Sequence, residues 1–406
     1  MLSRRDLLRN ALAMAPIAGG AALVASWPDW LESAVASQSL TIQDLLRTAP
    51  KARYWTTFAL AGSDCSKCHA PGENLSKPHT HTPTTVRCLL CAQGCTIKAG
   101  DRGKCRARMN VSGELRSLVY GRPLAIHVDP IEKKPFYNFL PGSDAFSLGT
   151  SGCPLRCKFC QNWTLSQVAP EDNDTQYAGP GTIVQAAASE RAPVIAFTYN
   201  EPTVFTEYLL DIAREAKKRG IRSVIVSCGF MNEAPLTEMC EALDAIKIDL
   251  KGFSEDFYRK VSSGELKPVL RSIKQVARSK VHLEIVNLMV PTLNDDKASV
   301  QGLVDWVAGE LGPDVPVHFT RFHPDYQLLN LPPTPIATLE RARDAAVAKG
   351  LHYAYVGNVP DHPGNHTYCP KCKKIVIQRT GFFVDQINLR NGACGFCGTK
   401  IAGVFA

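Results

Sequence analysis

Three closely spaced cysteines are the clearest chemical signal in this 406-residue chain. Cys153, Cys157 and Cys160 follow the spacing C-x3-C-x2-C. Three thiolates at this spacing can hold three corners of a cubane 4Fe–4S cluster, whereas electron-transfer clusters usually have four cysteine ligands. A local set of three would therefore leave one iron open to a substrate. Spacing alone leaves two alternatives, namely part of a zinc site or a ferredoxin-like cluster with a distant fourth ligand.

The residues before the three cysteines indicate where the set lies. The apolar, β-prone run Ala145–Leu148 is followed by small Gly, Thr and Ser residues that lead directly to Cys153. This order predicts a strand followed by a loop that carries the cysteines. A loop after a buried strand suits a catalytic cluster better than an electron-transfer cluster.

Most of the other cysteines are also clustered, and C-x2-C pairs favour metal ligation over scattered disulfides. The C-terminal set of four predicts a closed, zinc-ribbon-like site, with iron as the alternative metal. The N-terminal set of four would suit zinc or a second Fe–S cluster, and its spacing does not decide between them. The two sets are Cys88, Cys91, Cys95 and Cys105, and Cys369, Cys372, Cys394 and Cys397.

A short insert adds one more motif. Cys65, Cys68 and His69 form C-x-x-C-H, the attachment pattern of c-type haem. Haem also needs an apolar pocket, which this Pro/Ser/Thr-rich segment scarcely offers. A zinc site or a disordered loop is therefore the preferred interpretation.

The amino terminus resembles a twin-arginine export leader. Arg4 and Arg5 precede a weakly apolar stretch from Ala11 to Ala25, and Ala34–Ala36 offers a small-residue cleavage site. The pattern predicts a folded protein exported to the periplasm or outer face of the membrane. If the leader does not function, the protein is expected in the cytoplasm.

The charge and the apolar runs of the sequence bear on whether nucleic acid or a membrane is a partner. Net charge is +8, but no Lys/Arg-rich run with interleaved aromatic residues is present, so we expect no nucleic-acid partner. No stretch approaches the ~20 apolar residues of a membrane span. Contact with the membrane is therefore expected only during export through the leader.

Strand and helix patterns alternate through the middle of the chain. Near-continuous apolar strands separated by helices predict a parallel sheet covered by helices, here an α/β partial (β/α)6 barrel similar to a TIM barrel. The helix expected at Thr203–Arg219 is followed by Gly220, which would end it. The predicted divisions are a leader (1–36), an N-terminal Cys-rich module with the His/Cys insert (37–140), the barrel core (141–357) and a zinc-ribbon-like module (358–406).

One predicted strand carries three charges on one face. Lys247, Asp249 and Lys251 alternate with the apolar residues of Ala245–Leu250. Such charges are costly to bury without polar partners, so we expect contacts to a charged ligand. The alternative is a solvated edge strand.

Two further polar segments follow predicted strands. Thr198–Pro202 places Asn200 and Glu201 at a strand-to-helix turn, where a helix-capping acid is the alternative to a ligand contact. The last strand ends near His323, although a single histidine is more often structural.

Taken together, these motifs resemble the radical S-adenosylmethionine (radical SAM) superfamily. The segments that carry the likeness are Cys88–Cys105, Asp129–Pro135, Cys153–Cys160, Thr198–Pro202 and the terminal cysteines, in the order typical of the AmmeMemoRadiSam family, related to pyruvate formate-lyase activating enzyme. The likeness covers about residues 86–406.

The resemblance implies a 4Fe–4S cluster, S-adenosylmethionine and a barrel core. Glu201 corresponds to the acid of a Gly-Gly-Glu motif that receives the methionyl amino group, although Tyr199 and Asn200 replace the glycines. His323 is the implied histidine contact to S-adenosylmethionine. Asp249 and Lys251 are the expected strand contacts.

The function expected from these features is radical SAM chemistry. The enzyme would cleave S-adenosylmethionine with an electron from a low-potential donor, and the 5′-deoxyadenosyl radical would abstract hydrogen from an unidentified substrate, with a protein as one candidate. The alternative is a non-catalytic exported Fe–S and zinc protein, with or without haem, that handles electrons or metal.

Overall fold

The structure, a computed structural model, describes residues 40–57 and 84–405. The predicted leader and the Cys65–His69 motif lie outside these residues. All described residues belong to one compact unit. Within the described part of the chain, no helix combines the length and the apolar character needed to cross a membrane.

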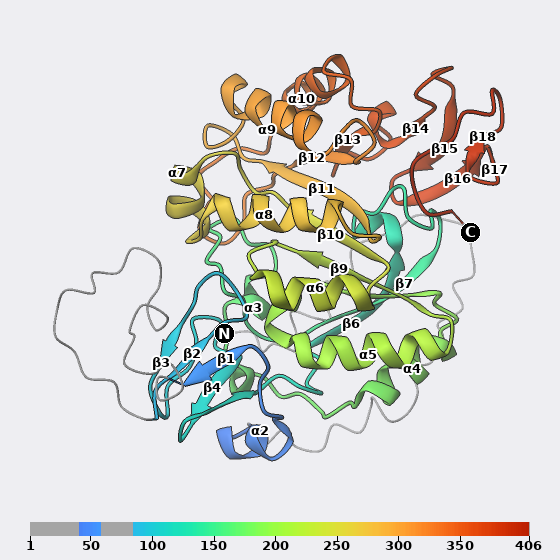
Figure 1. Ribbon diagram of the computed structural model, residues 1–406. Helices are drawn as coiled ribbons and strands as arrows, with labels where there is room; N and C mark the ends of the chain where they lie inside the picture. The colour runs from blue at the N-terminus through green and yellow to red at the C-terminus, as the bar shows by residue number, and fades with distance from the viewer. Residues whose placement is uncertain (1–39, 58–83, 406) are drawn as a thin grey trace, which may run out of the picture. The chain divides into compact units, whose positions relative to one another are not determined.

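A mixed eight-stranded sheet forms the centre of this unit (Figure 1). Seven of its strands run parallel, and β6 pairs antiparallel with β7 at one edge. In sheet order the strands are β13 (Ala354–Gly357), β12 (Val317–Arg321), β11 (His282–Met289), β10 (Ala245–Asp249), β9 (Arg222–Ser227), β8 (Val194–Phe197), β7 (Asp144–Gly149) and β6 (Ala125–Pro130).

Helices connect successive strands, as expected for parallel pairing. Figure 1 shows α5, α6 and α8 lying over one face of the sheet. The helices of the sheet region are α3 (Trp163–Ser166), α4 (Pro180–Ser189), α5 (Thr206–Lys218), α6 (Glu233–Ala242), α7 (Glu255–Phe257), α8 (Leu266–Ala277), α9 (Lys297–Glu310) and α10 (Ile336–Ala348).

The ends of α5 follow from its sequence. A short 3-10 turn, η6 (Pro202–Phe205), precedes it, so the predicted helix at 203–219 becomes α-helical only at Thr206. At the other end Gly220 adopts φ +70°, a left-handed conformation that glycine tolerates and that ends helices.

The main core lies between the helices and the sheet. On β10, the side chains of Ile246 and Ile248 are fully buried in it, as is that of Leu250 just beyond the strand. Alternation along the strand turns the residues between them to the opposite face. The predicted division of this strand into an apolar and a charged face is therefore confirmed.

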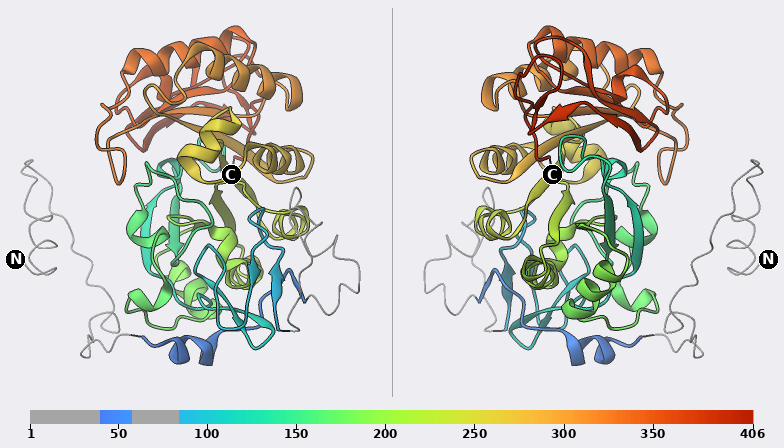
Figure 2. Two further views of the ribbon diagram at one scale, coloured as in Figure 1. Left: turned by 90° about the vertical axis from the view of Figure 1, so that its left-hand side faces the viewer. Right: turned by 90° about the vertical axis from the view of Figure 1, so that its right-hand side faces the viewer.

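Two cysteine-bearing modules flank the sheet. Figure 2 shows the C-terminal strands (red) beside the end of the sheet covered by α9 and α10, with the N-terminal strands (blue) toward the other end. The N-terminal module contains α2 (Ile42–Thr48), β1 (Trp55–Thr57), β2 (Val86–Cys88), β3 (Thr96–Ile97), β4 (Arg108–Val111) and β5 (Glu114–Ser117). The C-terminal module contains β14 (Thr367–Tyr368), β15 (Ile375–Thr380), β16 (Phe383–Ile387), β17 (Leu389–Arg390) and β18 (Ala393–Cys394).

Candidate functional site

A cavity of about 470 Å³ lies where the parallel strands end. The carboxyl ends of parallel strands meet at one edge of a sheet, which is where ligands of such sheets usually bind. Eleven of the polar residues and cysteines that line this cavity come from the segments after β7, β8 and β9 and from β10 with its extension. They are Cys153, Cys157, Cys160, Thr198, Tyr199, Asn200, Glu201, Cys228, Lys247, Asp249 and Lys251.

The loop after β7 carries the three predicted cysteines into this cavity. Cys157 is buried, and Cys153 and Cys160 are half-buried. The amides of Arg156 and Lys158 donate to carbonyls of η7 (Tyr258–Ser262), at 2.9 and 3.0 Å. Burial raises the pKa of the Cys153 thiol, and Glu201 raises it further. A neighbouring cation would favour the thiolate form there.

Asn200 secures the start of the same loop. Its side chain donates to the carbonyl of Gly152 at 2.9 Å and accepts from the amide of Thr150 at 3.1 Å. Gly152 adopts φ +94°, which suits glycine at this tight entry. Asn200, which stands where a glycine was expected, thus positions the cysteine loop.

Glu201 is buried and fully hydrogen-bonded. One carboxylate oxygen accepts from the hydroxyls of Thr203, at 2.6 Å, and Ser227, at 2.7 Å. The other oxygen accepts from the amide of Cys228 at 2.7 Å. The carboxylate also caps η6 through the Thr203 amide. Glu201 therefore lines the cavity and also caps η6, which was the alternative role for this residue. Its bonds to Ser227 and Cys228 tie the end of β8 to the end of β9.

Tyr199 adopts a left-handed backbone conformation of the kind that glycine favours. Its φ is +72°, which is rare for a residue with a bulky side chain. Its hydroxyl donates to Asp129 at 3.1 Å, and the Lys134 ammonium lies 5.0 Å from its ring centroid. The left-handed backbone at Tyr199 is therefore strained.

Asp129 organises this rim of the cavity. Its carboxylate accepts from Lys133 and Lys134, each at 2.7 Å. Burial opposes ionisation, but the two lysines outweigh it and lower the pKa of Asp129 to about 2. Lys133 and Lys134 line the cavity. The sequence analysis used this segment only as a family signature and did not identify these side chains as site residues.

The charged face of β10 points into the cavity as predicted. Asp249 bonds both neighbouring lysines, Lys247 and, at 3.2 Å, Lys251. Burial would lower the pKa of Lys251, but Asp249 and Cys157 raise it well above its ordinary value. An ion-paired lysine therefore lies beside the cysteine loop, with its ammonium 5.7 Å from the ring centroid of Phe159. Asn294 fixes its backbone, because the Asn294 amide donates to the Lys251 carbonyl at 2.8 Å.

The histidines near the end of the sheet are separated. His323 is exposed and does not line the cavity, so its contact with a ligand stays a prediction. His318 is fully buried, and its Nε2 lies 2.6 Å from Glu284. Glu284 also lies 2.9 Å from Nε2 of His282. The sequence signal that could have indicated this buried group is the charged residue within an otherwise apolar strand.

The C-terminal cysteines converge as predicted. Sulfur atoms of Cys369 and Cys397 are 3.6 Å apart, and those of Cys372 and Cys394 are 3.7 Å apart. All four sulfurs lie within 4.8 Å of one another. This is a four-thiol group suited to one metal ion. The same module also lines the cavity, through Phe382 in the turn between β15 and β16.

The N-terminal cysteines gather at the β2–β3 turn and the loop before β4. Cys88 and Cys105 are buried, and Cys91 and Cys95 are half-buried. Their module contacts the Cys153–Cys160 loop directly, since Gln93 donates to the carbonyl of Pro154 at 2.9 Å.

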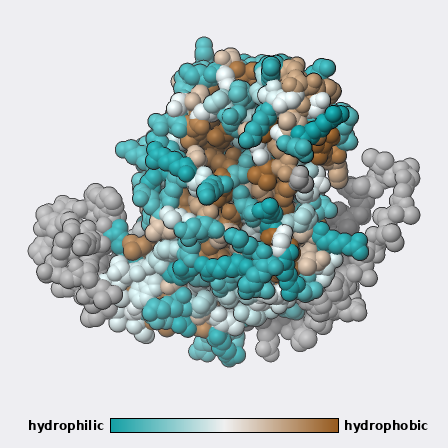
Figure 3. Space-filling model, turned by 45° about the vertical axis from the view of Figure 1, so that its right-hand side comes forward, coloured by the Kyte–Doolittle hydropathy of each residue, from teal (hydrophilic) through white to brown (hydrophobic). Residues whose placement is uncertain are grey.

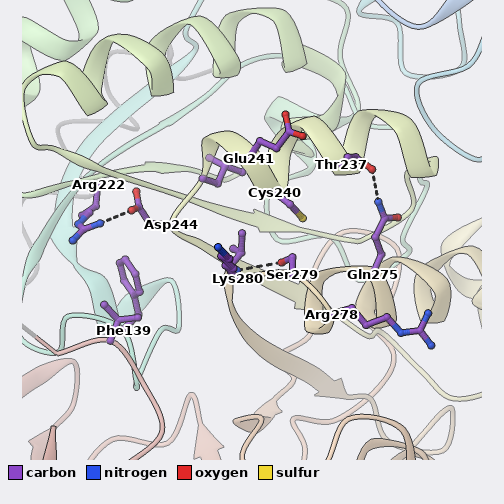
Figure 4. A pocket seen from close by; sticks show the side chains of 13 residues that line it. Phe139, Arg222, Thr237, Cys240, Glu241, Asp244, Gln275, Arg278, Ser279 and Lys280 are labelled. Atoms are coloured by element: carbon purple, nitrogen blue, oxygen red, sulfur yellow. Dashed lines mark hydrogen bonds and ion pairs between the residues drawn. The ribbon is translucent and has the colours of Figure 1, made fainter.

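A second cavity, of about 630 Å³, lies at the opposite edge of the sheet (Figure 4). Arg222 at the start of β9 pairs there with Asp244 at 2.7 Å. Figure 4 shows Cys240 and Gln275 among its lining residues, on α6 and α8. None of the predicted site residues lines it. The chemistry-bearing groups belong to the smaller cavity.

Comparisons with known proteins bear on the family of this chain. Residues 147–305 match the Radical SAM superfamily. An uncharacterized protein of Methanocaldococcus jannaschii, MJ0808, is 42% identical over 318 residues, which cover 78% of this chain and 95% of that protein. The chain therefore belongs to the radical SAM superfamily, and the family implies a 4Fe–4S cluster and S-adenosylmethionine.

More distant relatives place the chain near the activating enzymes. The pyruvate formate-lyase-activating enzyme of Staphylococcus epidermidis is 22% identical over 229 residues, covering 53% of this chain and 90% of that enzyme. A solved domain of the pyruvate-formate lyase-activating enzyme from Bacteroides vulgatus aligns at 17% identity and a TM-score of 0.37, covering 40% of this chain and 98% of that domain. The sequence relationships support an enzyme of activating-enzyme-like character.

Proposed function

We propose that this chain is a radical SAM enzyme whose cluster is held by Cys153, Cys157 and Cys160. The observation that carries the proposal is that these three thiols share one cavity with Glu201 and with the charged face of β10. Three cysteine donors from one loop match a cluster with an open iron. A cavity of about 470 Å³ has the size of a small-molecule site.

The side chains around the loop fit an anionic cluster and a zwitterionic ligand. When bound, the cluster and S-adenosylmethionine would supply reductive cleavage to methionine and a 5′-deoxyadenosyl radical that abstracts hydrogen. Lys251, held by Asp249, would balance negative charge beside Cys157. Asn200 would hold the entry to the loop, and Glu201 would line the ligand cavity while it ties the end of β8 to the end of β9 through Ser227 and Cys228. In this proposal the parallel sheet curves as a partial barrel around the site.

A protein is the proposed substrate, with a low-potential electron carrier as the donor. Its support is the activating-enzyme likeness together with exposed apolar residues near the cavity. Phe382 lines the cavity, and its neighbour Phe383 is 70% exposed. Figure 3 shows apolar surface gathered over the upper half of the visible face. Apolar surface of this kind is typical of protein contacts.

The decisive assay is production of 5′-deoxyadenosine. The anaerobically reconstituted, dithionite-reduced chain should convert S-adenosylmethionine to 5′-deoxyadenosine and methionine, measured by mass spectrometry. Cys157→Ala should abolish the product, whereas Cys240→Ala, a half-buried thiol outside the cavity, should not. A reduced sample that binds S-adenosylmethionine without forming any cleavage product would sink the proposal and favour the non-catalytic alternative.

Export by the twin-arginine pathway is also proposed. It rests on the Arg4–Arg5 pair and the stretch that follows it. A reporter fused after residues 1–45 should reach the periplasm only in cells with a working twin-arginine translocase. Export that persists without that translocase, or no export at all, would contradict it.

A further inference from the structure

The cysteine sets of the described residues differ in how tightly their sulfurs gather. A single tetrahedral ion with metal–sulfur bonds of about 2.3 Å holds its ligands about 3.8 Å apart. The C-terminal set has this spacing, with sulfur pairs at 3.6 and 3.7 Å. Across residues 40–57 and 84–405 it is the one group of three or more His, Cys, Asp or Glu residues whose ligand atoms all lie within 4.8 Å of one another. The three cysteines of the cavity and the four N-terminal cysteines are more widely spread.

Two of the N-terminal four, Cys95 and Cys105, nevertheless face a common point beside Gly103. A methyl group on Gly103 would lie 3.7 Å from the sulfur of Cys105 and 3.8 Å from that of Cys95. The amide of Lys104 donates to the Cys95 sulfur at 3.4 Å, and hydrogen bonds to sulfur are typical of cluster ligands. On the neighbouring turn, the Cys88 amide donates to the Cys95 carbonyl at 2.9 Å. Two sulfurs that face one point, in a set too widely spread for a single ion, fit a polynuclear cluster.

Two buried arginines of the same module keep N–H groups without a hydrogen-bond partner. Arg87 is 7% exposed, and its Nε and Nη1 atoms have no hydrogen-bond partner. Its Nη2 lies 3.2 Å from the position of a methyl group on Gly94, which precedes Cys95. Arg108 is 1% exposed and pairs with Glu207 at 2.7 Å, while its Nε has no partner. Buried N–H groups are rarely left unpaired, so an anionic acceptor is expected nearby.

The module also has a direct connection to the loop of the cavity. Arg156 donates to the carbonyl of Cys153 at 2.7 Å and also to the carbonyl of Lys104, the neighbour of Cys105. Gly152 packs so closely on the carbonyl of Cys105 that no side chain would fit. One side chain thus bridges the backbone beside both cysteine sets.

We propose that Cys88, Cys91, Cys95 and Cys105 hold a second polynuclear iron–sulfur cluster that relays electrons to the cluster at Cys153–Cys160. In each relay step the second cluster loses one electron and the cluster of the cavity gains one. A reduced low-potential electron carrier then returns one electron to the second cluster. The relay rests on the proposed function, whereas the presence of the second cluster does not.

The experiment separates the two cysteine sets in the full-length chain. The triple variant Cys153→Ala/Cys157→Ala/Cys160→Ala, reconstituted anaerobically with iron and sulfide, should keep about half of the wild-type iron and a reduced-cluster EPR signal. Cys95→Ala should lose that signal and keep the signal of the cavity cluster. Cys240→Ala, the matched control, should keep both. Circular dichroism checks that each variant is folded.

The same EPR spectra test whether the two clusters lie close together. When both clusters of the wild-type chain are reduced, their spins should interact and broaden the two signals, which should sharpen in each single-cluster variant. A folded triple variant that contains a second zinc and no iron would overturn the site. Two clusters without any spin interaction would overturn the relay. A wild-type chain that carries both clusters but forms no 5′-deoxyadenosine would instead count against the proposed function, because the triple variant tests the second cluster independently.

Discussion

Arg379 of the C-terminal module lies 3.4 Å from Glu132, and both side chains are fully buried. The guanidinium also donates to the carbonyl of Tyr137 at 2.6 Å and lies 4.3 Å from the centroid of its ring. Glu132 belongs to η4 (Ile131–Lys133), next to Lys134 and Pro135, which line the cavity. The four-cysteine module is therefore anchored to the rim of the proposed active site.

We predict that removing one partner of the buried Arg379–Glu132 pair strongly destabilises the folded protein. Arg379→Met leaves the Glu132 carboxylate buried without its cation, which should lower the free energy of unfolding by about 3–5 kcal/mol. The double variant Arg379→Met/Glu132→Leu should recover most of the loss, because no buried charge remains. Urea unfolding under anaerobic conditions measures both.

The exposed pair Lys349–Asp305, at 2.6 Å, provides the control. Lys349→Ala should cost less than about 1 kcal/mol, because surface ion pairs contribute little. If Arg379→Met costs no more than Lys349→Ala, the buried pair does not anchor the module.

A second prediction concerns pH. Burial lowers the pKa of His318 below its ordinary 6.5, although Glu284 partly opposes the shift. Because the folded-state pKa is lowered, the stabilisation is complete above pH 6.5 and is lost as the pH falls toward the folded-state value. The free energy of unfolding should therefore decline below pH 6.5, with a His318 contribution of up to about 1.4 kcal/mol per pH unit. His318→Gln should have a shallower slope between pH 6.5 and 5, and an unchanged slope would contradict this role.

Sequence patterns predicted those parts of the fold that depend on neighbouring residues. The strand predicted at Ala145–Leu148 lies within β7 (Asp144–Gly149), and the charged face of Ala245–Asp249 was assigned correctly. The edge strand β6 was not predicted, because exposed and half-buried residues and a proline obscure its apolar pattern. The sheet has seven parallel strands where six units were predicted.

The rim of the site could not be predicted in the same way. The Tyr199 hydroxyl meets Asp129 across 70 residues, and Arg379 meets Glu132 across 247. Such pairs depend on how the modules pack on the sheet, which no local pattern encodes. The three cysteines could be predicted from the sequence, because the loop that carries them is short and continuous.

The left-handed backbone at Tyr199 gives a third prediction. Tyr199→Gly and Tyr199→Val both remove the ring and the hydroxyl, but only glycine accepts φ +72° without strain. Strain of about 1–2 kcal/mol corresponds to roughly a tenfold change in an equilibrium constant. Tyr199→Gly should therefore bind S-adenosylmethionine at least about tenfold more tightly than Tyr199→Val, as measured by equilibrium dialysis. Equal affinities would show that the backbone conformation at this position does not matter.

Metal at the C-terminal cysteines should control the order of the cavity rim as well as that of its own module. The wild-type chain is expected to carry one zinc in this group, measured by mass spectrometry of the metals. Cys372→Ala should lose it, because a tetrahedral site needs all four thiolates. Hydrogen exchange should then accelerate in residues 367–405 and, through Arg379 and Glu132, in residues 129–138. Cys240→Ala should leave both segments protected. If residues 129–138 exchange at the wild-type rate in the metal-free variant, the anchoring of the rim does not depend on the metal, and Arg379 keeps its place without it.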